Sequence, residues 1–102
     1  MPKDHYLFDL TPRRALLCDG VQLITARITS NAAGETLYQG RGYVREGRAS
    51  LLRDLRRRDI TPTPDALEKI NATVPTAIDI ARMGWEAAFG QLIATHAVPV
   101  LA

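Results

Sequence analysis

The sequence has few of the residues on which redox, metal and nucleophilic chemistry depend. Its 102 residues include one cysteine and two histidines, and these three lie far apart in the chain. A lone cysteine excludes an internal disulfide, and the scattered histidines and acids match no common zinc-site spacing. Cys18 ends an apolar run, where a cysteine is typically an inert core residue. We therefore expect no metal, no cofactor and no catalytic residue, and we predict that the protein is not an enzyme.

Long apolar runs are missing as well. A membrane-spanning helix needs roughly 18 or more consecutive apolar residues, and no stretch of this chain comes close. The first residues, Met1–Tyr6, lack the apolar segment of a signal peptide. Phosphate-binding glycine loops and the Gly-x-Ser-x-Gly nucleophile motif are also absent. These absences, together with the single cysteine, predict a cytoplasmic protein without a membrane partner.

The composition that remains is that of a folded domain. Apolar residues make up 46% of the chain and charged residues 24%, near the average for globular proteins. A chain of this length can form one hydrophobic core without covalent or metal cross-links. We predict one domain over residues 1–102 of the α+β class, with a small antiparallel sheet followed by about three helices.

Strand periodicity occupies the first part of the chain, over residues about 5–44, and predicts three or four antiparallel strands. In the first of these, Tyr6, Phe8 and Leu10 recur at every second position. Side chains alternate between the two faces of a strand, so these three are expected to share one face.

The next two strands are expected to form a hairpin. Asp19-Gly20 separates two apolar runs, and this dipeptide favours a tight turn between paired strands. In the strand that follows, Ile24, Ala26 and Ile28 alternate with more polar residues. We expect these three to face the core and the residues between them to point outward.

The period then changes to that of helices, which we predict over residues about 48–58, 64–72 and 76–95. Thr63 precedes a proline at the first position of the second helix, which is typical of a helix start. Thr76, with an aspartate three residues later, predicts a capping box for the third.

Charge is unevenly distributed along the chain. The formal net charge is only +2, but residues 41–58 hold seven arginines against two acids. Residues 59–102 hold two basic groups against five acids, and residues 1–40 are balanced with four of each. A block of this kind suggests a surface for an anionic partner, although charge runs also occur on ordinary solvated helix faces.

We interpret the basic block as a nucleic-acid or partner-binding surface. Arginine presents forked donors that suit phosphate or carboxylate groups, and exposed tyrosines can stack on bases. The predicted binding residues are Arg41, Arg45, Arg48, Arg53, Arg56, Arg57, Tyr38 and Tyr43. A helix-turn-helix is disfavoured, because the helix in the recognition position carries Asp65 and Glu68 against one lysine.

Two functions follow from this surface. The first is a small binding or regulatory protein that engages nucleic acid. The alternative is a protein-interaction module that meets an acidic protein surface and inhibits or regulates a nucleic-acid-processing complex. Small accessory proteins of phages and plasmids, anti-CRISPR proteins among them, share this general profile, which is an analogy of class and not of sequence.

The third helical segment also predicts self-association. It is apolar nearly all round, which is unusual for a helix with an exposed face. Small residues recur along it at helical spacing and would let a second backbone approach. We expect a homodimer in which the contact is formed by Ala81, Gly84, Trp85 and Ala88.

Overall fold

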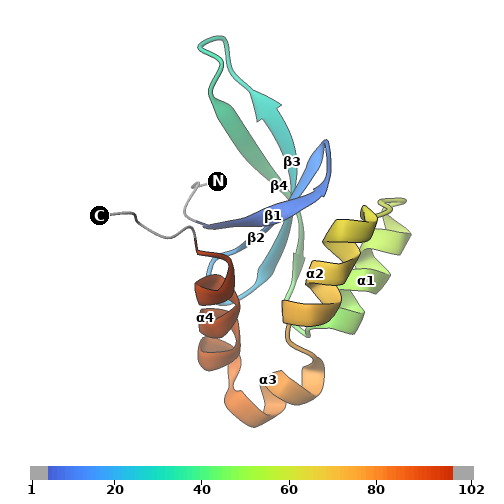
Figure 1. Ribbon diagram of the computed structural model, residues 1–102, viewed down its shortest axis with the longest axis vertical. Helices are drawn as coiled ribbons and strands as arrows, with labels where there is room; N and C mark the ends of the chain where they lie inside the picture. The colour runs from blue at the N-terminus through green and yellow to red at the C-terminus, as the bar shows by residue number, and fades with distance from the viewer. Residues whose placement is uncertain (1–4, 98–102) are drawn as a thin grey trace.

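The computed structural model describes residues 5–97 and confirms an α+β fold (Figure 1). Four antiparallel strands follow one another in the order of the sequence as a meander. They are β1 (Tyr6–Thr11), β2 (Arg14–Cys18), β3 (Leu23–Ser30) and β4 (Thr36–Val44). The helices are α1 (Arg48–Arg57), α2 (Pro64–Thr73), α3 (Ala77–Met83) and α4 (Trp85–His96).

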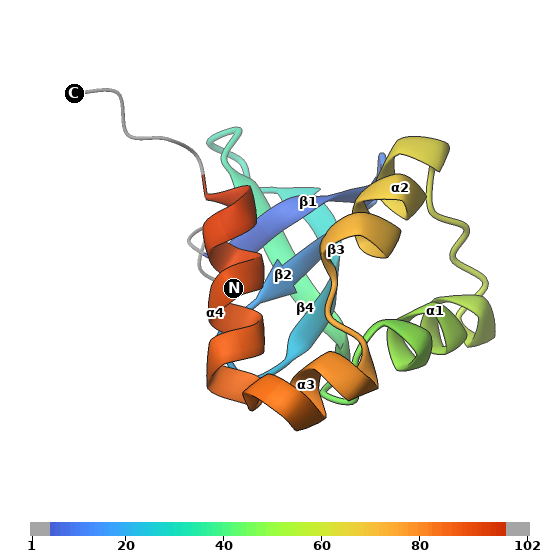
Figure 2. The same cartoon turned by 60° about the horizontal axis from the view of Figure 1, so that its bottom comes forward.

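All four helices lie on one face of the sheet (Figure 2). In both views α4 lies on one side, α1 and α2 lie on the other, and α3 joins the two sides. The main core fills the space between, with contributions from all four strands and all four helices. At its centre are Phe89 and Leu92 of α4, Ile70 of α2 and Leu55 of α1, all nearly inaccessible to solvent. The β3–β4 hairpin extends beyond this helix layer (Figure 1).

The face of the sheet away from the helices carries a second, smaller cluster. Ala15, Leu17, Ile24 and Ala26 are fully buried there. The prediction that Ile24 and Ala26 are core residues is therefore confirmed, but their core is not the one beneath the helices. Thr25, expected to point outward, is buried on the helix side, because β3 is an inner strand covered on both faces.

The prediction that Tyr6 shares a face with Phe8 and Leu10 is wrong. The register of β1 against β2 shifts between Tyr6 and Phe8 and again near Leu10. Each irregularity adds a residue to one strand and reverses the face of those that follow. Phe8 and Leu10 consequently enter the main core, while Tyr6 pairs with Leu17 of the second cluster.

The predicted hairpin and helix starts are confirmed. Gly20 has a positive φ of 95° in the turn after β2, where the Asp19 carboxylate accepts the backbone N–H groups of Val21 and Gln22. Thr63 accepts a backbone hydrogen bond at the start of α2. Thr76 and its capping-box partner begin α3 with reciprocal bonds.

The predicted third helix over 76–95 is divided into α3 and α4 at Gly84. Gly84 has φ 85° and ψ 156°, a conformation that essentially only glycine adopts. It ends α3 by donating its N–H to the Ile80 carbonyl and begins α4 by accepting the N–H of Ala88. The sequence suggested one continuous helix because small and apolar residues keep a helical spacing on both sides of Gly84. Periodicity alone does not show that the backbone leaves the helical conformation at a single glycine.

No helix within residues 5–97 is long and apolar enough to cross a lipid bilayer.

Candidate nucleic-acid interface

Helix α1 presents its arginines on the face away from the core. Leu51 and Leu55 anchor the helix in the main core, so that Arg53 and Arg56 lie on its outer face and are exposed. Within residues 5–97 the structure places no carboxylate at ion-pair distance from either side chain. Their positive charge is therefore available to a ligand.

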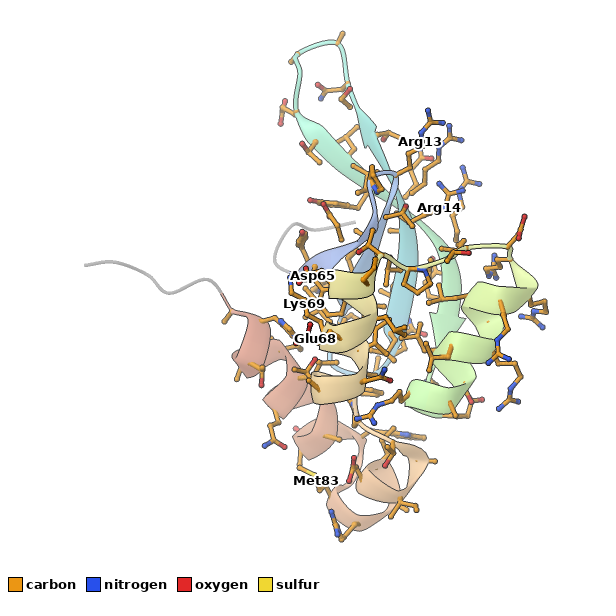
Figure 3. All side chains as sticks on the ribbon, turned by 45° about the vertical axis from the view of Figure 1, so that its right-hand side comes forward. Arg13, Arg14, Asp65, Glu68, Lys69 and Met83 are labelled. Atoms are coloured by element: carbon orange, nitrogen blue, oxygen red, sulfur yellow. The ribbon has the colours of Figure 1, made fainter. Side chains whose placement is uncertain are left out.

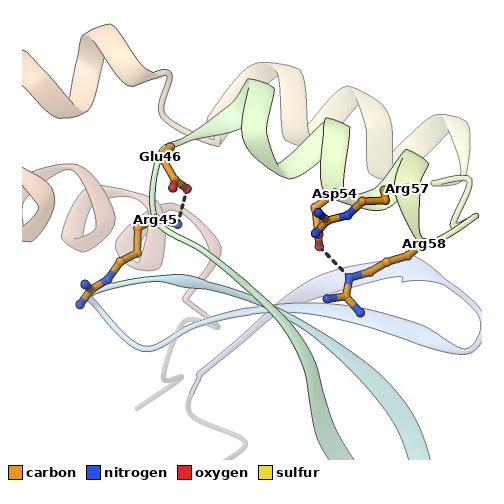
Figure 4. A network of polar contacts seen from close by, with 5 residues as sticks. All are labelled: Arg45, Glu46, Asp54, Arg57 and Arg58. Carbon is orange, nitrogen blue, oxygen red and sulfur yellow. Dashed lines mark hydrogen bonds and ion pairs between the residues drawn. The ribbon is translucent and has the colours of Figure 1, made fainter.

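The last two arginines of the block are partly neutralised by Asp54 (Figure 4). Arg57 Nη2 lies 2.6 Å from one carboxylate oxygen of Asp54 and Arg58 Nε lies 2.9 Å from the other. Burial alone would raise the pKa of Asp54, but the hydrogen bonds from Arg57 and Arg58 outweigh it and hold the pKa below its usual value. Two arginines share one negative charge, so the cluster remains positive.

Arg48, predicted as a binding residue, forms hydrogen bonds within the protein. Its Nε donates to the Val74 carbonyl at 2.9 Å, and its backbone N–H donates to the Pro75 carbonyl at 2.8 Å. These bonds fasten the start of α1 to the segment between α2 and α3. Arg48 therefore has a structural role in addition to any contact it makes with a ligand.

Arg41 and Arg45 lie along the outer strand and the loop after it. Arg41 Nη2 donates to the Gln39 side chain at 3.2 Å. The Arg45 guanidinium lies 5.3 Å from the centre of the Trp85 ring, a cation–π contact across to α4. The basic surface thus continues from α1 along β4 and reaches the junction of α3 and α4.

The two tyrosines of the predicted site are separated. Tyr43 is 55% exposed and lines a shallow hollow of about 360 Å³ with Glu46, Ser50, Arg53 and Arg57. Tyr38 instead packs on the second cluster, with its ring 5.5 Å from that of Tyr6. Tyr43 therefore joins the α1 arginines, and Tyr38 does not.

Folding brings together a second group of three arginines, which the charge distribution along the chain did not reveal. Arg13 and Arg14 lie at the turn between β1 and β2, on the side of the sheet where α1 lies (Figure 3). Arg27 of β3 stands directly opposite Arg14. Residues 1–40 are balanced in charge, so only the strand register reveals this second basic group.

Helix α2 forms an acidic border next to this surface. Asp65, Glu68 and Lys69 lie on it (Figure 3), and Lys69 pairs with Asp65 at 3.1 Å. The excess of carboxylates on α2 argues against this helix as the one that approaches phosphates, in line with the sequence.

Cys18 and His96, the natural candidates for a nucleophile and a base, both pack against other residues of the fold. Cys18 is buried in the main core, and burial raises the pKa of its thiol. His96 Nε2 is 2.8 Å from the Thr73 hydroxyl, and its ring packs on Phe8. Burial and the nearby charge of Lys69 lower the pKa of His96. Within residues 5–97 the structure shows no group of three or more potential metal ligands.

The four residues predicted for self-association do not lie on one exposed helix face in the structure. Ala88 is buried in the main core, while Ala81 lies on α3 and is exposed. The exposed apolar surface is instead at the corner between α3 and α4, where Trp85 is 50% and Met83 40% exposed. With Val21 they line an open hollow of about 750 Å³.

Comparison with protein-family models, with curated proteins and with solved structures gave no match to this chain.

Proposed function

We propose that this is a non-enzymatic binding protein that engages nucleic acid through the arginine-rich surface of α1 and β4. The observation that carries the proposal is the exposed pair Arg53 and Arg56, which has no carboxylate partner within residues 5–97. Tyr43 lies beside Arg53 in the same hollow. Guanidinium groups suit phosphates, and an exposed ring can stack on a base.

Binding by such a surface is dominated by phosphate contacts. It should weaken steeply as salt is raised and depend little on base sequence. The test is fluorescence anisotropy with labelled single-stranded and double-stranded DNA and RNA at two salt concentrations. The double variant Arg53→Gln/Arg56→Gln should bind more weakly than wild type, whereas Arg82→Gln, on α3, should not. An absence of wild-type binding to all four probes at low salt refutes the proposal.

The alternative is a protein partner with an acidic surface, within an inhibited or regulated nucleic-acid-processing complex. It is favoured by one observation: Arg45 covers one side of the exposed Trp85 next to Met83. Arginine, tryptophan and methionine are enriched in protein interfaces. Pull-down from a native lysate, with and without nuclease, separates the two functions, because a direct protein partner survives nuclease treatment.

Self-association remains a proposal, with a changed site. The corner lined by Val21, Met83 and Trp85 offers an apolar surface to a second copy, whereas Ala88 is buried within the chain. Exposed apolar surface of this kind often marks an interface. A homodimer would double the arginine surface and raise avidity for a long polyanion.

A further inference from the structure

Arg14 and Arg27 form a like-charged pair across neighbouring strands. They are direct partners in the register of β2 and β3. Direct cross-strand partners have Cβ atoms about 4.5–5.5 Å apart, and like charges at that distance destabilise a sheet. Within residues 5–97 no carboxylate forms an ion pair with either guanidinium. The strand register therefore places two arginines opposite each other, and neither has a carboxylate partner within residues 5–97.

This pair continues into a row that crosses three strands. Arg27 is opposite Gln39 of β4, and Gln39 accepts a hydrogen bond from Arg41 at 3.2 Å. The register of β3 against β4 shifts between Thr25 and Ala26, so Arg41 is an additional residue on the outer strand. Its guanidinium is thereby directed to the end of the row.

Arg58 reaches the same face of the sheet from the end of α1. A Cβ atom placed on Gly42 would lie 3.0 Å from Arg58 Nε, so the absence of a side chain at Gly42 gives Arg58 room. Gly42 is opposite Thr25, two residues from Arg27, a separation of about 7 Å along the strand. Figure 4 shows the Arg58 side chain between α1 and the sheet, held by Asp54.

The row presents guanidinium groups on the face of the sheet opposite to Tyr6 and Tyr38. Arg14 and Arg27 point to the same face as Leu16 and Leu23, on the helix side of the sheet. Tyr6 and Tyr38 lie on the opposite face with the second cluster. A ligand on this row therefore meets donors suited to phosphate and is separated by the sheet from the rings of Tyr6 and Tyr38.

We propose that Arg14, Arg27, Arg41 and Arg58 bind backbone phosphates of a nucleic-acid strand that crosses the sheet and continues along α1. This inference rests on the proposed function and adds a second contact region to it. The ligand supplies the negative charge that the Arg14–Arg27 pair lacks. A substitution that neutralises Arg27 should therefore have opposite effects on stability and on binding. It should stabilise the sheet by relieving the repulsion with Arg14, and it should weaken binding by removing a donor to phosphate.

The test uses Arg27→Gln and Arg27→Glu, with Arg82→Gln as the control for a decrease in net charge at a remote site. In anisotropy titrations Arg27→Gln should bind about 3- to 10-fold more weakly at low salt. For each phosphate that the variant no longer neutralises, the slope of log affinity against log salt should fall by about 0.9 for duplex and about 0.7 for single-stranded probes. Weaker binding to duplex, to single strand or to both supports the inference and identifies the form bound.

Thermal unfolding without ligand provides the second measurement. Arg27→Glu should have a higher Tm than wild type in low salt, because the introduced carboxylate would pair with Arg14. Added salt should narrow this difference by screening both the repulsion and the pair. Arg27→Gln, which only removes the repulsion, should have a Tm at or above that of wild type, and this result excludes misfolding as the cause of its weaker binding.

The outcomes separate the two proposals. Wild-type binding that Arg27→Gln leaves unchanged, or that Arg82→Gln weakens equally, overturns the phosphate row and leaves the α1 surface in place. A wild-type protein that binds no probe overturns both.

Discussion

The rings of Tyr6 and Tyr38 are 5.5 Å apart, although they belong to the two outer strands of the sheet. In a flat sheet those strands would be separated by three spacings of about 4.8 Å each. The sheet is therefore coiled, so that its edges approach each other on the face away from the helices. This closure explains how Leu17 and Ile24 are fully buried on a face that no helix covers.

The tyrosine contact should be measurable as a coupling energy. In a double-mutant cycle with Tyr6→Ala and Tyr38→Ala, urea unfolding should give a coupling of about 0.5–1.5 kcal/mol. Tyr6→Phe keeps the ring and serves as the matched control, losing only the 2.9 Å hydrogen bond to Asp9. Strictly additive effects of the two alanine substitutions would show that the edges do not support each other.

The same tyrosine predicts alkaline sensitivity. Burial, and secondarily the hydrogen bond to Asp9, raises the pKa of Tyr6 from 10.0 to about 12. A raised pKa in the folded state contributes stability below the unfolded value and loses it as pH rises through the folded value. Wild type should therefore lose stability between about pH 10 and 12, and Tyr6→Phe should lose less, as followed by circular dichroism.

Asp54→Asn should destabilise the protein near neutral pH. Arg57 and Arg58 lose a charged acceptor that is only 9% exposed, at a cost of about 1–3 kcal/mol. Because the folded pKa of Asp54 is lowered, its contribution is present above the usual value of 3.8 and is lost as pH falls through the folded pKa. The unfolding curves of wild type and variant should converge in acid.

The matched control for this substitution is Asp65→Asn. The Asp65–Lys69 pair is largely exposed, so its removal should change stability by at most about 1 kcal/mol. Asp54→Asn should also bind nucleic acid at least as tightly as wild type, because it frees positive charge. Equal stability of both variants at pH 7 would contradict the bridging role of Asp54.

Gly84→Ala should destabilise the protein by about 1–3 kcal/mol, because the backbone there is strained for any residue with a side chain. The space around Gly84 is open, so the effect is conformational and not steric. Gly90→Ala is the control: it lies within α4, also in open space, and should stabilise by about 1 kcal/mol. Chemical denaturation of both variants measures the contrast, and a stabilising Gly84→Ala would argue for a continuous helix.

The solution mass tests self-association. At tens of micromolar, light scattering should report a dimer for wild type and a monomer for Trp85→Ser. Trp85 is the single tryptophan, so its fluorescence should shift to shorter wavelength as protein concentration rises and the ring is covered. A wild-type monomer at these concentrations would refute the dimer and leave the α3–α4 corner to another partner.

Local signals in the sequence determined the elements and their order. Apolar runs and alternation indicated the strands, the change to helical period from Gly47 located α1, and Thr63 and Thr76 marked the starts of α2 and α3. These features were predictable because each depends on residues at most four positions apart. Helix caps and tight turns satisfy backbone groups nearby, whatever the rest of the chain does.

The tertiary structure decided which residues share a face and which charges are free. Irregularities in β1 and β4 change the face of the residues beyond them, which placed Tyr6 away from Phe8 and directed Arg41 toward Gln39. Strand register brought Arg27 opposite Arg14, from a part of the chain whose charges balance. A sequence records spacing along the chain, but register and coiling arise from packing between strands, and these determine where charge gathers.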